Sequence, residues 1–200
     1  RNSGDQTSAE TNLTSAFAVG TGTRVLNTQK LFTQGSLITT DNALDAAIEG
    51  SGFFQVLLPD DRIGYTRNGT FSRNAEGVLT TGSGYVVQPE IQIPEGASQI
   101  NISGNGIVSI VADGAVVAEE VGQLTLADFA NPRGLQPVGE SFSVETQASG
   151  PPIIANPQEE GFGKLVQGAL ESSNVNVVQE LVDMIETQRA YEVSSKSISS

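Results

Sequence analysis

The sequence contains no cysteine and no histidine among its 200 residues. Without cysteine there can be no disulfides, Fe–S clusters, thiolate zinc sites or cysteine nucleophiles. Without histidine, the Ser-His-Asp triad and histidine-based metal sites are excluded as well. We therefore expect no catalytic residues, no metal site and no bound cofactor, and we expect that the protein is not an enzyme.

Positive charge is also scarce, because ten Lys and Arg residues stand against 23 Asp and Glu residues, a net charge of −13. Binding to nucleic acid or to an anionic membrane surface normally needs a basic patch, so we expect neither partner. No apolar run is long enough to insert across a bilayer, and no signal-peptide pattern opens the sequence. Since the sequence begins with Arg rather than Met, we expect it to be a fragment.

Short β-type runs are abundant between residue 51 and about residue 146. They are rich in Val, Ile, Thr, Tyr and Phe and are separated by Gly, Pro, Asn and Asp, which predicts an antiparallel β domain. Asn68-Gly69, within YTRNGTFSR, is the strongest two-residue hairpin signal, and NAEG and TGSG follow at turn spacing. Five aromatic residues in these runs are expected to pack in the core or across strands: Phe53, Phe54, Tyr65, Phe71 and Tyr85.

Two kinds of motif that could suggest chemistry are better explained as turns. The G-x-G pairs at residues 20–22 and 50–52 precede extended sequence, whereas a phosphate-binding loop opens a helix. The adjacent carboxylates at residues 60–61 and 159–160 lack the alternating ligands of a calcium loop. A glycosidase-type pair of carboxylates stays open as an alternative, because its two members need not be close in sequence.

The regions on either side of the β domain have different patterns. Residues 1–24 are polar and rich in Thr and Ser, which indicates an extended arm. Residues 25–50 have unevenly spaced apolar residues, typical of short strands and irregular extended chain. Residues 147–164 contain three prolines and several glycines, and we interpret them as a linker.

The last segment changes to a helical period. Val178, Leu181, Val182 and Ile185 fall on one side of a predicted helix, and Asn176 is placed to cap its start. Burying four or five aliphatic side chains stabilises a protein by roughly 1.5–3 kcal/mol each, and an isolated helix is marginal in water. Because the earlier sequence offers no second amphipathic helix, we expect a missing terminal segment or another subunit to cover this face.

The same stripe turns polar beyond Ile185, where it continues through Gln188 and Arg189. This change has two interpretations: the helix becomes solvated there, or it faces another protein chain through hydrogen-bonded polar groups.

Several of these stretches resemble bacterial flagellar rod and hook proteins. The run SNVNVVQELVDMIETQRAYEVSSK, residues 173–196, is similar to the C-terminal signature of that family. GSGFFQV, YTRNGTFSRNAEGVLTTGSGYVVQP and QLTLADFANPRGLQPVGESFSVETQASGPP resemble the family's middle region. Within the family, the polar arm running into VGTGTRV resembles the stretch that distinguishes the distal rod from the hook.

The resemblance implies a mainly β fold, in which an antiparallel β domain is inserted in a partly extended second domain with a C-terminal α-helix. It divides the chain into an extended distal-rod arm (1–24), a discontinuous inner domain (25–50 and 147–200) and an outer β domain (51–146). The family's N-terminal helix and last C-terminal turns are absent from the sequence, so we expect this fragment to be monomeric.

The resemblance also implies a function. Such a subunit would be exported through the flagellar type III channel and would self-assemble helically into a rigid, hollow distal rod that transmits torque to the hook. Its partners would be further copies, other rod proteins, the hook protein, and the peptidoglycan-layer and outer-membrane rings around the periplasm-spanning rod of the basal body. The expected subunit-interface residues are Asn174, Asn176, Val178, Leu181, Val182, Ile185, Gln188, Arg189 and Tyr191.

Three alternatives stay open at this point. The chain could be a hook or proximal rod subunit, which residues 1–24 would distinguish. From other functional classes, it could be a secreted β-rich carbohydrate-active enzyme that uses two carboxylates, or a β-rich adhesin.

Overall fold

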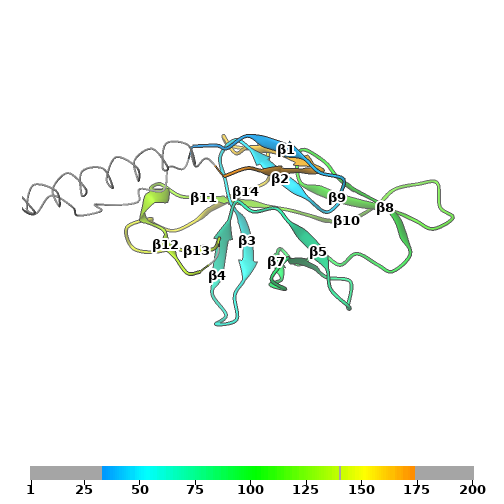
Figure 1. Ribbon diagram of the computed structural model, residues 1–200, viewed down its shortest axis with the longest axis horizontal. Helices are drawn as coiled ribbons and strands as arrows, with labels where there is room; N and C mark the ends of the chain where they lie inside the picture. Colours follow the sequence, from blue (N-terminus) through cyan, green and yellow to red (C-terminus); the bar gives the residue numbers. More distant parts are fainter. Residues whose placement is uncertain (1–32, 140, 174–200) are drawn as a thin grey trace, which may run out of the picture. The chain divides into compact units, whose positions relative to one another are not determined.

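The computed structural model describes residues 33–139 and 141–173, here called the β unit, as a set of short antiparallel strands (Figure 1). The prediction of a mainly β, antiparallel fold is confirmed for these residues. The predicted arm at residues 1–24 and the predicted C-terminal helix lie outside them. No helix in the β unit is long and apolar enough to cross a membrane.

The strands, with one short 3-10 helix, are β1 (Leu37–Thr39), β2 (Ala46–Glu49), β3 (Phe54–Leu57), β4 (Ile63–Thr66), β5 (Phe71–Arg73), β6 (Leu79–Thr81), β7 (Val87–Gln88), β8 (Ala97–Ile102), β9 (Ile107–Ala112), β10 (Glu119–Gln123), β11 (Leu126–Asp128), η1 (Pro132–Gly134), β12 (Gln136–Pro137), β13 (Ser143–Val144), β14 (Ile153–Ala155), β15 (Lys164–Gln167) and β16 (Ala169–Glu171).

The largest sheet has five strands in the order β12-β13-β4-β3-β7. One of its faces supplies Phe54 and Val56, both fully buried, to the main core. The Phe54 ring meets the Phe71 ring edge to face, with centroids 4.9 Å apart and an interplanar angle of 84°. Phe53 and Tyr65 pack together with Phe129 in a second apolar cluster. The sequence-based prediction that the aromatic residues pack in the core or across strands is confirmed.

The predicted hairpin at Asn68-Gly69 is wrong. The strands on either side of it do not pair with each other, since β4 pairs with β3 and β13 whereas β5 pairs with β6. The Asn68 side chain instead accepts the Thr70 N–H at 3.1 Å, and the Gly69 carbonyl accepts the Ala46 N–H at 3.0 Å. A Cβ atom on Gly69 would lie 1.5 Å from the Ala46 oxygen. The glycine therefore permits a close crossing of two chain segments rather than a tight turn between paired strands.

The other predicted turns are confirmed within the β unit. Gly77 and Gly84 close the NAEG and TGSG turns with φ angles of 85° and 89°, and each N–H donates to a carbonyl three residues earlier at 3.0 Å. Gly50 and Gly52 have φ angles of 118° and 127°, which explains the G-x-G spacing at residues 50–52 as backbone geometry.

The interpretation of residues 147–164 as a linker is wrong in part, because β14 lies within them and pairs with β11. Pro151 and Pro152 immediately precede this strand, where a missing N–H disturbs no ladder. After a further turn, β15 pairs with β2 over four residues. Ile48 of β2 and Leu165 of β15 then share the main core with Phe54.

One polar side chain links the late strands to the middle of the chain. The Gln167 amide nitrogen donates to the Ala43 and Ile100 carbonyls, both at 2.8 Å, and its oxygen accepts the Ile102 N–H at 3.1 Å. All the hydrogen-bonding groups of this side chain except one lone pair are thereby used. This fixes the end of β15 against β8.

Candidate functional site

The first and last segments of the β unit run side by side. β1 and β16 pair antiparallel, with Leu37 opposite Glu171, and the Ser172 N–H donates to the Ser36 carbonyl at 2.7 Å. Figure 1 shows β1 beside the late strands. The chain that precedes residue 33 and the chain that follows residue 173 therefore join the β unit at adjoining points.

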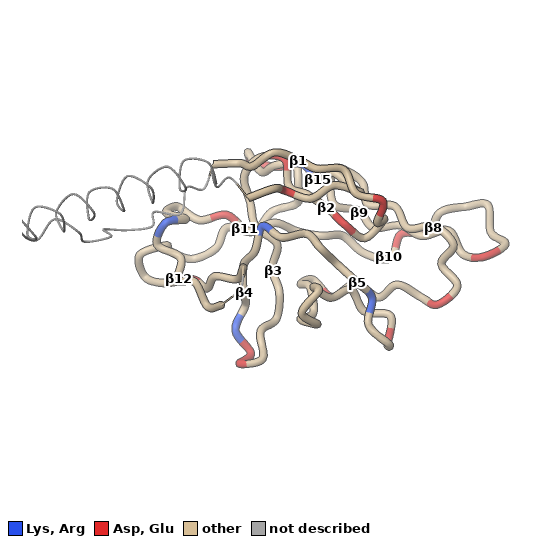
Figure 2. The backbone as a smooth tube through the Cα atoms, viewed as in Figure 1, with Lys and Arg blue, Asp and Glu red and all other residues tan. Residues whose placement is uncertain are grey.

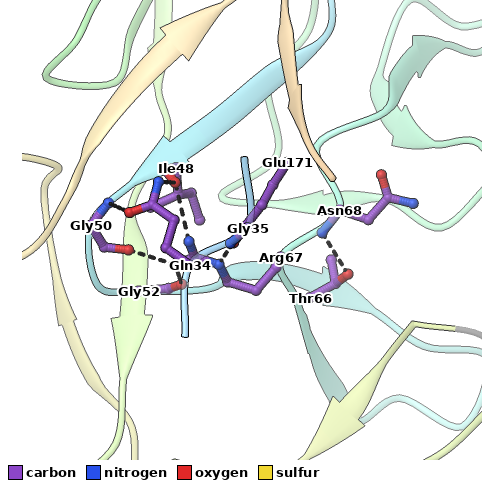
Figure 3. Close-up of polar contacts among 9 residues, drawn as sticks. All are labelled: Gln34, Gly35, Ile48, Gly50, Gly52, Thr66, Arg67, Asn68 and Glu171. Carbon is purple, nitrogen blue, oxygen red and sulfur yellow. Dashed lines mark hydrogen bonds and ion pairs between the residues drawn. The ribbon is translucent and has the colours of Figure 1, made fainter. Parts of the chain in front are cut away.

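A cluster of polar side chains holds this meeting point together, and we call Gln34, Gly35, Arg67 and Glu171 the junction cluster (Figure 3). The Arg67 Nε donates to the Glu171 Oε2 at 2.8 Å, and the other carboxylate oxygen accepts the Gly35 N–H, also at 2.8 Å. One carboxylate thus bonds both the segment entering the β unit and the end of β4. The charge-assisted pair is the kind of contact that fixes geometry as well as adding stability.

Three more N–H donors of Arg67 go to backbone carbonyls of β2 and of the turn after it. Nη1 donates to Gly50 and Gly52 at 2.7 and 2.8 Å, and Nη2 donates to Ile48 at 3.1 Å. Gln34 contacts the same turn, since its amide donates to Ile48 at 3.2 Å and accepts the Gly50 N–H at 3.0 Å. The planar guanidinium, with its rigid fork of donors, fits this task better than a lysine ammonium would.

The junction also depends on a close backbone approach. A Cβ atom on Gly35 would lie 1.8 Å from the Ser172 carbonyl oxygen, so no larger residue fits without moving the chain. Because Gly35 and Ser172 belong to the entering and leaving segments, this contact brings the two ends of the β unit together.

The junction ion pair is better shielded from water than the other ion pairs of the β unit. Its side chains are 25% and 12% exposed, whereas those of Arg62 and Asp60 are 55% and 48% exposed. Solvent screening weakens exposed pairs strongly and partly buried pairs much less. The Arg67–Glu171 pair is therefore a structural element, in contrast to the surface pair at the β3–β4 turn.

The adjacent carboxylates at residues 60–61 and 159–160 lie in turns and bends, as the sequence analysis expects. Asp60 bonds Arg62, and this hydrogen bond holds the pKa of the Asp60 carboxyl below its usual value. Asp61 and Glu160 have positive φ angles of 62° and 50° at turn positions. Within the β unit, no group of three or more acidic residues is arranged to hold a metal ion.

One ionisable group in the second apolar cluster has a shifted pKa. Burial, with a smaller contribution from the negative charge of Glu145, raises the pKa of Tyr65 to about 12. Its ring packs edge to face against Phe129 with centroids 4.8 Å apart. A phenol so hard to ionise serves packing rather than acid–base chemistry at neutral pH.

The predicted subunit-interface residues, from Asn174 to Tyr191, all lie outside the described residues, so their role stays a prediction. The junction cluster lies in the β unit, where the chain leads into that segment. Sequence reasoning missed it because its members are widely separated and belong to common polar types. The one available signal was an arginine directly after a strand, beside the glycine-rich turn at residues 50–52.

Comparison with known proteins identifies the family. Residues 47–110 match the profile described as "Flagellar hook protein FlgE/F/G D1 domain", and residues 166–200 match "Flagellar basal body rod FlgEFG protein C-terminal". The flagellar basal-body rod protein FlgG of Buchnera aphidicola is 50% identical over 199 residues, which cover the whole chain and 76% of the relative. The chain belongs to the flagellar rod and hook protein family. Membership rests on both profiles and on similarity along the whole chain.

Two further relatives show how similarity varies within the flagellar rod and hook family. FlgG of Caulobacter vibrioides is 43% identical over 197 residues, covering 98% of this chain and 75% of the relative. The flagellar basal-body rod protein FlgF of Escherichia coli is 35% identical over 175 residues, covering 84% and 68%. The family relationship gives no support to the carbohydrate-active enzyme as an alternative.

Proposed function

We propose that this chain is a structural subunit of the flagellar basal-body rod, of the distal-rod type. Many copies assemble helically into a rigid, hollow shaft that crosses the periplasm and transmits torque to the hook. The observation that carries the proposal is the similarity over the whole chain to relatives named as basal-body rod proteins, including the terminal segment at residues 166–200. Identity to FlgG of Buchnera aphidicola and of Caulobacter vibrioides, at 50% and 43%, is higher than identity to FlgF of Escherichia coli, at 35%, which favours the distal-rod type over the proximal one.

The junction cluster gives this function a mechanical basis. A shaft transmits torque only if each subunit keeps a fixed angle between the segments that hold it in the polymer and the rest of its body. In the β unit, the Arg67–Glu171 pair and the Gly35 contact fix the points at which the two chain segments leave. The junction therefore acts as a stiff connection rather than a hinge.

The proposed domain organisation follows the same division. Residues 25–50 and 147–200 form an inner domain that makes the contacts of the shaft, residues 51–146 form an outer β domain, and residues 1–24 form the arm of the distal-rod type. The pairing of β1 with β16 and of β2 with β15 supports this division, because it joins the early and late segments.

The subunit interface is proposed to lie on the C-terminal segment. Val178, Leu181, Val182 and Ile185 form its apolar stripe, and the polar residues Gln188 and Arg189 continue the stripe as contacts between subunits. Asn174, Asn176 and Tyr191 complete the proposed set. The partners are further copies, other rod proteins, the hook protein, and the peptidoglycan-layer and outer-membrane rings.

The surface charge of the β unit is compatible with a position inside the rings. Figure 2 shows the positions of Asp and Glu residues spread over several loops and strands, with few Lys and Arg positions among them. A predominantly acidic, soluble surface resists nonspecific association with other acidic surfaces.

Replacement of the rod gene in a non-motile deletion strain of a flagellated bacterium tests the proposal. The chain, extended at both ends with the matching segments of that bacterium's own FlgG, should restore rods of normal length and swimming. Basal bodies that end at the proximal rod, although the chimaera is produced and exported, would contradict the proposal.

A further inference from the structure

Two surfaces of the β unit each expose a pair of adjacent large apolar side chains that the core does not use. On β14, Ile153 and Ile154 are 53% and 54% exposed. In the connection between β9 and β10, Val116 and Val117 are 98% and 78% exposed. The two surfaces belong to different sheets, β11-β14 and β10-β9-β8.

The first surface also has an open backbone edge. The Ala127 N–H and C=O both bond Phe53, at 2.9 and 2.8 Å, and Ala127 lies opposite Ile154 in the β11–β14 register. In an antiparallel ladder, the N–H and C=O of one residue point to the same side. The Ile154 N–H and C=O therefore point away from β11, and they have no partner in the β unit. Such an edge is a template for another strand.

One basic residue that has no partner within the β unit lies in the loop that follows β11. Of the five basic residues in the β unit, Arg62, Arg67 and Lys164 form ion pairs, and Arg73 donates to the Pro94 carbonyl at 3.1 Å. Arg133, in η1, is exposed and is the one basic residue of the β unit that bonds nothing in it.

The loop that carries Arg133 is held beside the chain that leads into β14. The Asn131 N–H donates to the Ser149 carbonyl at 3.3 Å, and the Asn131 side chain donates to the Ala148 carbonyl at 3.0 Å. Ile153 follows Ser149 by four residues. β11 ends at Asp128, opposite Ile153, so the loop with Arg133 follows directly from the strand that pairs with β14. We call Arg133, Ile153 and Ile154 together the edge surface.

The second surface also combines exposed apolar side chains with charged ones, but its charges are negative. Val116 and Val117 lead directly into Glu119 and Glu120, which are exposed at the start of β10. β10 is an edge strand of its sheet, and neither glutamate belongs to an ion pair of the β unit. We call residues 116–120 the tip surface.

We propose that the edge surface of one copy binds the tip surface of the next copy. Ile153 and Ile154 contact Val116 and Val117, the tip backbone pairs with the open edge of β14, and Arg133 faces the two glutamates. Contact between two edge surfaces would place Arg133 against Arg133, and contact between two tip surfaces would gather four carboxylates, so like charges disfavour both symmetric arrangements.

This contact repeats without closing on itself. Because two different surfaces meet, each bound copy still presents one free edge surface and one free tip surface, so copies add in an open series. The inference rests on the proposed rod function and adds a second contact, between β units, to the one proposed for the C-terminal segment.

Disulfide cross-linking in assembled rods tests the contact, since the chain has no cysteine of its own. Rods are isolated from bacteria that carry the double variant Val117→Cys with Ile154→Cys in the terminally extended chain, and are then oxidised. We expect a ladder of covalently linked multimers, and dimers at most for either single variant. The matched control is Val117→Cys with Ile38→Cys, because Ile38 is as exposed as Ile154, at 55%, but lies on β1. Equal cross-linking in the control, or none in the double variant within intact rods, would overturn the inference.

A charge exchange covers the case in which the cysteine variants fail to assemble. Arg133→Glu alone, and Glu119→Arg with Glu120→Arg, should each reduce rod assembly, whereas the triple exchange should recover it. Recovery of rod assembly in the triple exchange supports the contact. An assembly defect of the same size in the single, double and triple exchanges overturns it. If the unmodified chain itself never enters rods, the proposed function fails; if it enters rods but the exchange has no effect, only the contact fails.

Discussion

Arg67 and Glu171 are 104 residues apart in the sequence, and Arg67 Nε lies 2.8 Å from Glu171 Oε2. The pair joins the end of β4 to the end of β16, and through Gly35 it also reaches the segment that enters the β unit. A single ionic contact thereby fixes both ends of the β unit relative to the turn after β2.

Replacing Arg67 with Met should lower the free energy of unfolding by about 2–4 kcal/mol, because the partly buried Glu171 loses its counterion and three carbonyls lose their donor. Urea denaturation of the 200-residue chain measures the change. Arg62→Met is the matched control, and it should leave the stability nearly unchanged because its pair with Asp60 is exposed. Equal losses of unfolding free energy in the two variants would show that the Arg67–Glu171 pair stabilises the chain no more than the exposed Arg62–Asp60 pair does.

Replacing Gly69 with Ala should destabilise the β unit by about 3 kcal/mol, because the new methyl group would overlap the Ala46 carbonyl and force two segments apart. Gly82→Ala is the control, since nothing lies within 4 Å of its Cβ position and its φ is not in the left-handed region. Differential scanning calorimetry compares the two. A Gly69 variant as stable as the Gly82 variant would contradict the close crossing seen here.

The stability of the chain should fall as the pH rises from about 10 to about 12. In this interval the unfolded chain releases the Tyr65 proton, at its ordinary pKa near 10, while the folded chain retains it. The folded state binds more protons, so its stability is fully present below pH 10 and declines above that value. Tyr65→Phe keeps the ring packing against Phe129 and should remove this part of the slope, as measured by urea denaturation across the interval. An unchanged slope would contradict the raised pKa.

In the terminally extended chain, replacing Leu181 with Asp should abolish rod assembly and leave the β unit folded, because a charge would lie on the proposed apolar stripe. The comparison variant is Glu180→Asp, which keeps a carboxylate on the opposite side of the predicted helix. Electron microscopy reports assembly, and circular dichroism reports the fold. Normal rods from the Leu181 variant would remove this residue from the subunit interface.

Sequence reasoning succeeded where local pattern decides the structure and failed where distant segments decide it. The strand-rich composition, the turns at Gly77 and Gly84 and the burial of Phe54 and Phe71 in the core follow from residue type and spacing. The hairpin signal at Asn68-Gly69 was misleading, because the Ala46 segment competes for the glycine carbonyl and β5 pairs onward with β6.

The prolines before β14 were misleading in another way. They are typical of linkers, and nothing local in the sequence shows that Ile153 and Ile154, which follow them, pair with β11. The junction cluster was not predicted at all, because Gln34, Arg67 and Glu171 come together only once β1 lies beside β16. Contacts of this kind depend on the whole topology, which a pattern of single residues does not specify.

The most direct test of the account is electron microscopy of the chain extended at both ends with the terminal segments of a FlgG relative. We predict straight, hollow tubes of uniform diameter at high protein concentration, whereas the 200-residue chain stays monomeric under the same conditions. An extended chain that sediments as a single folded species at every concentration, without forming filaments, would contradict the rod function.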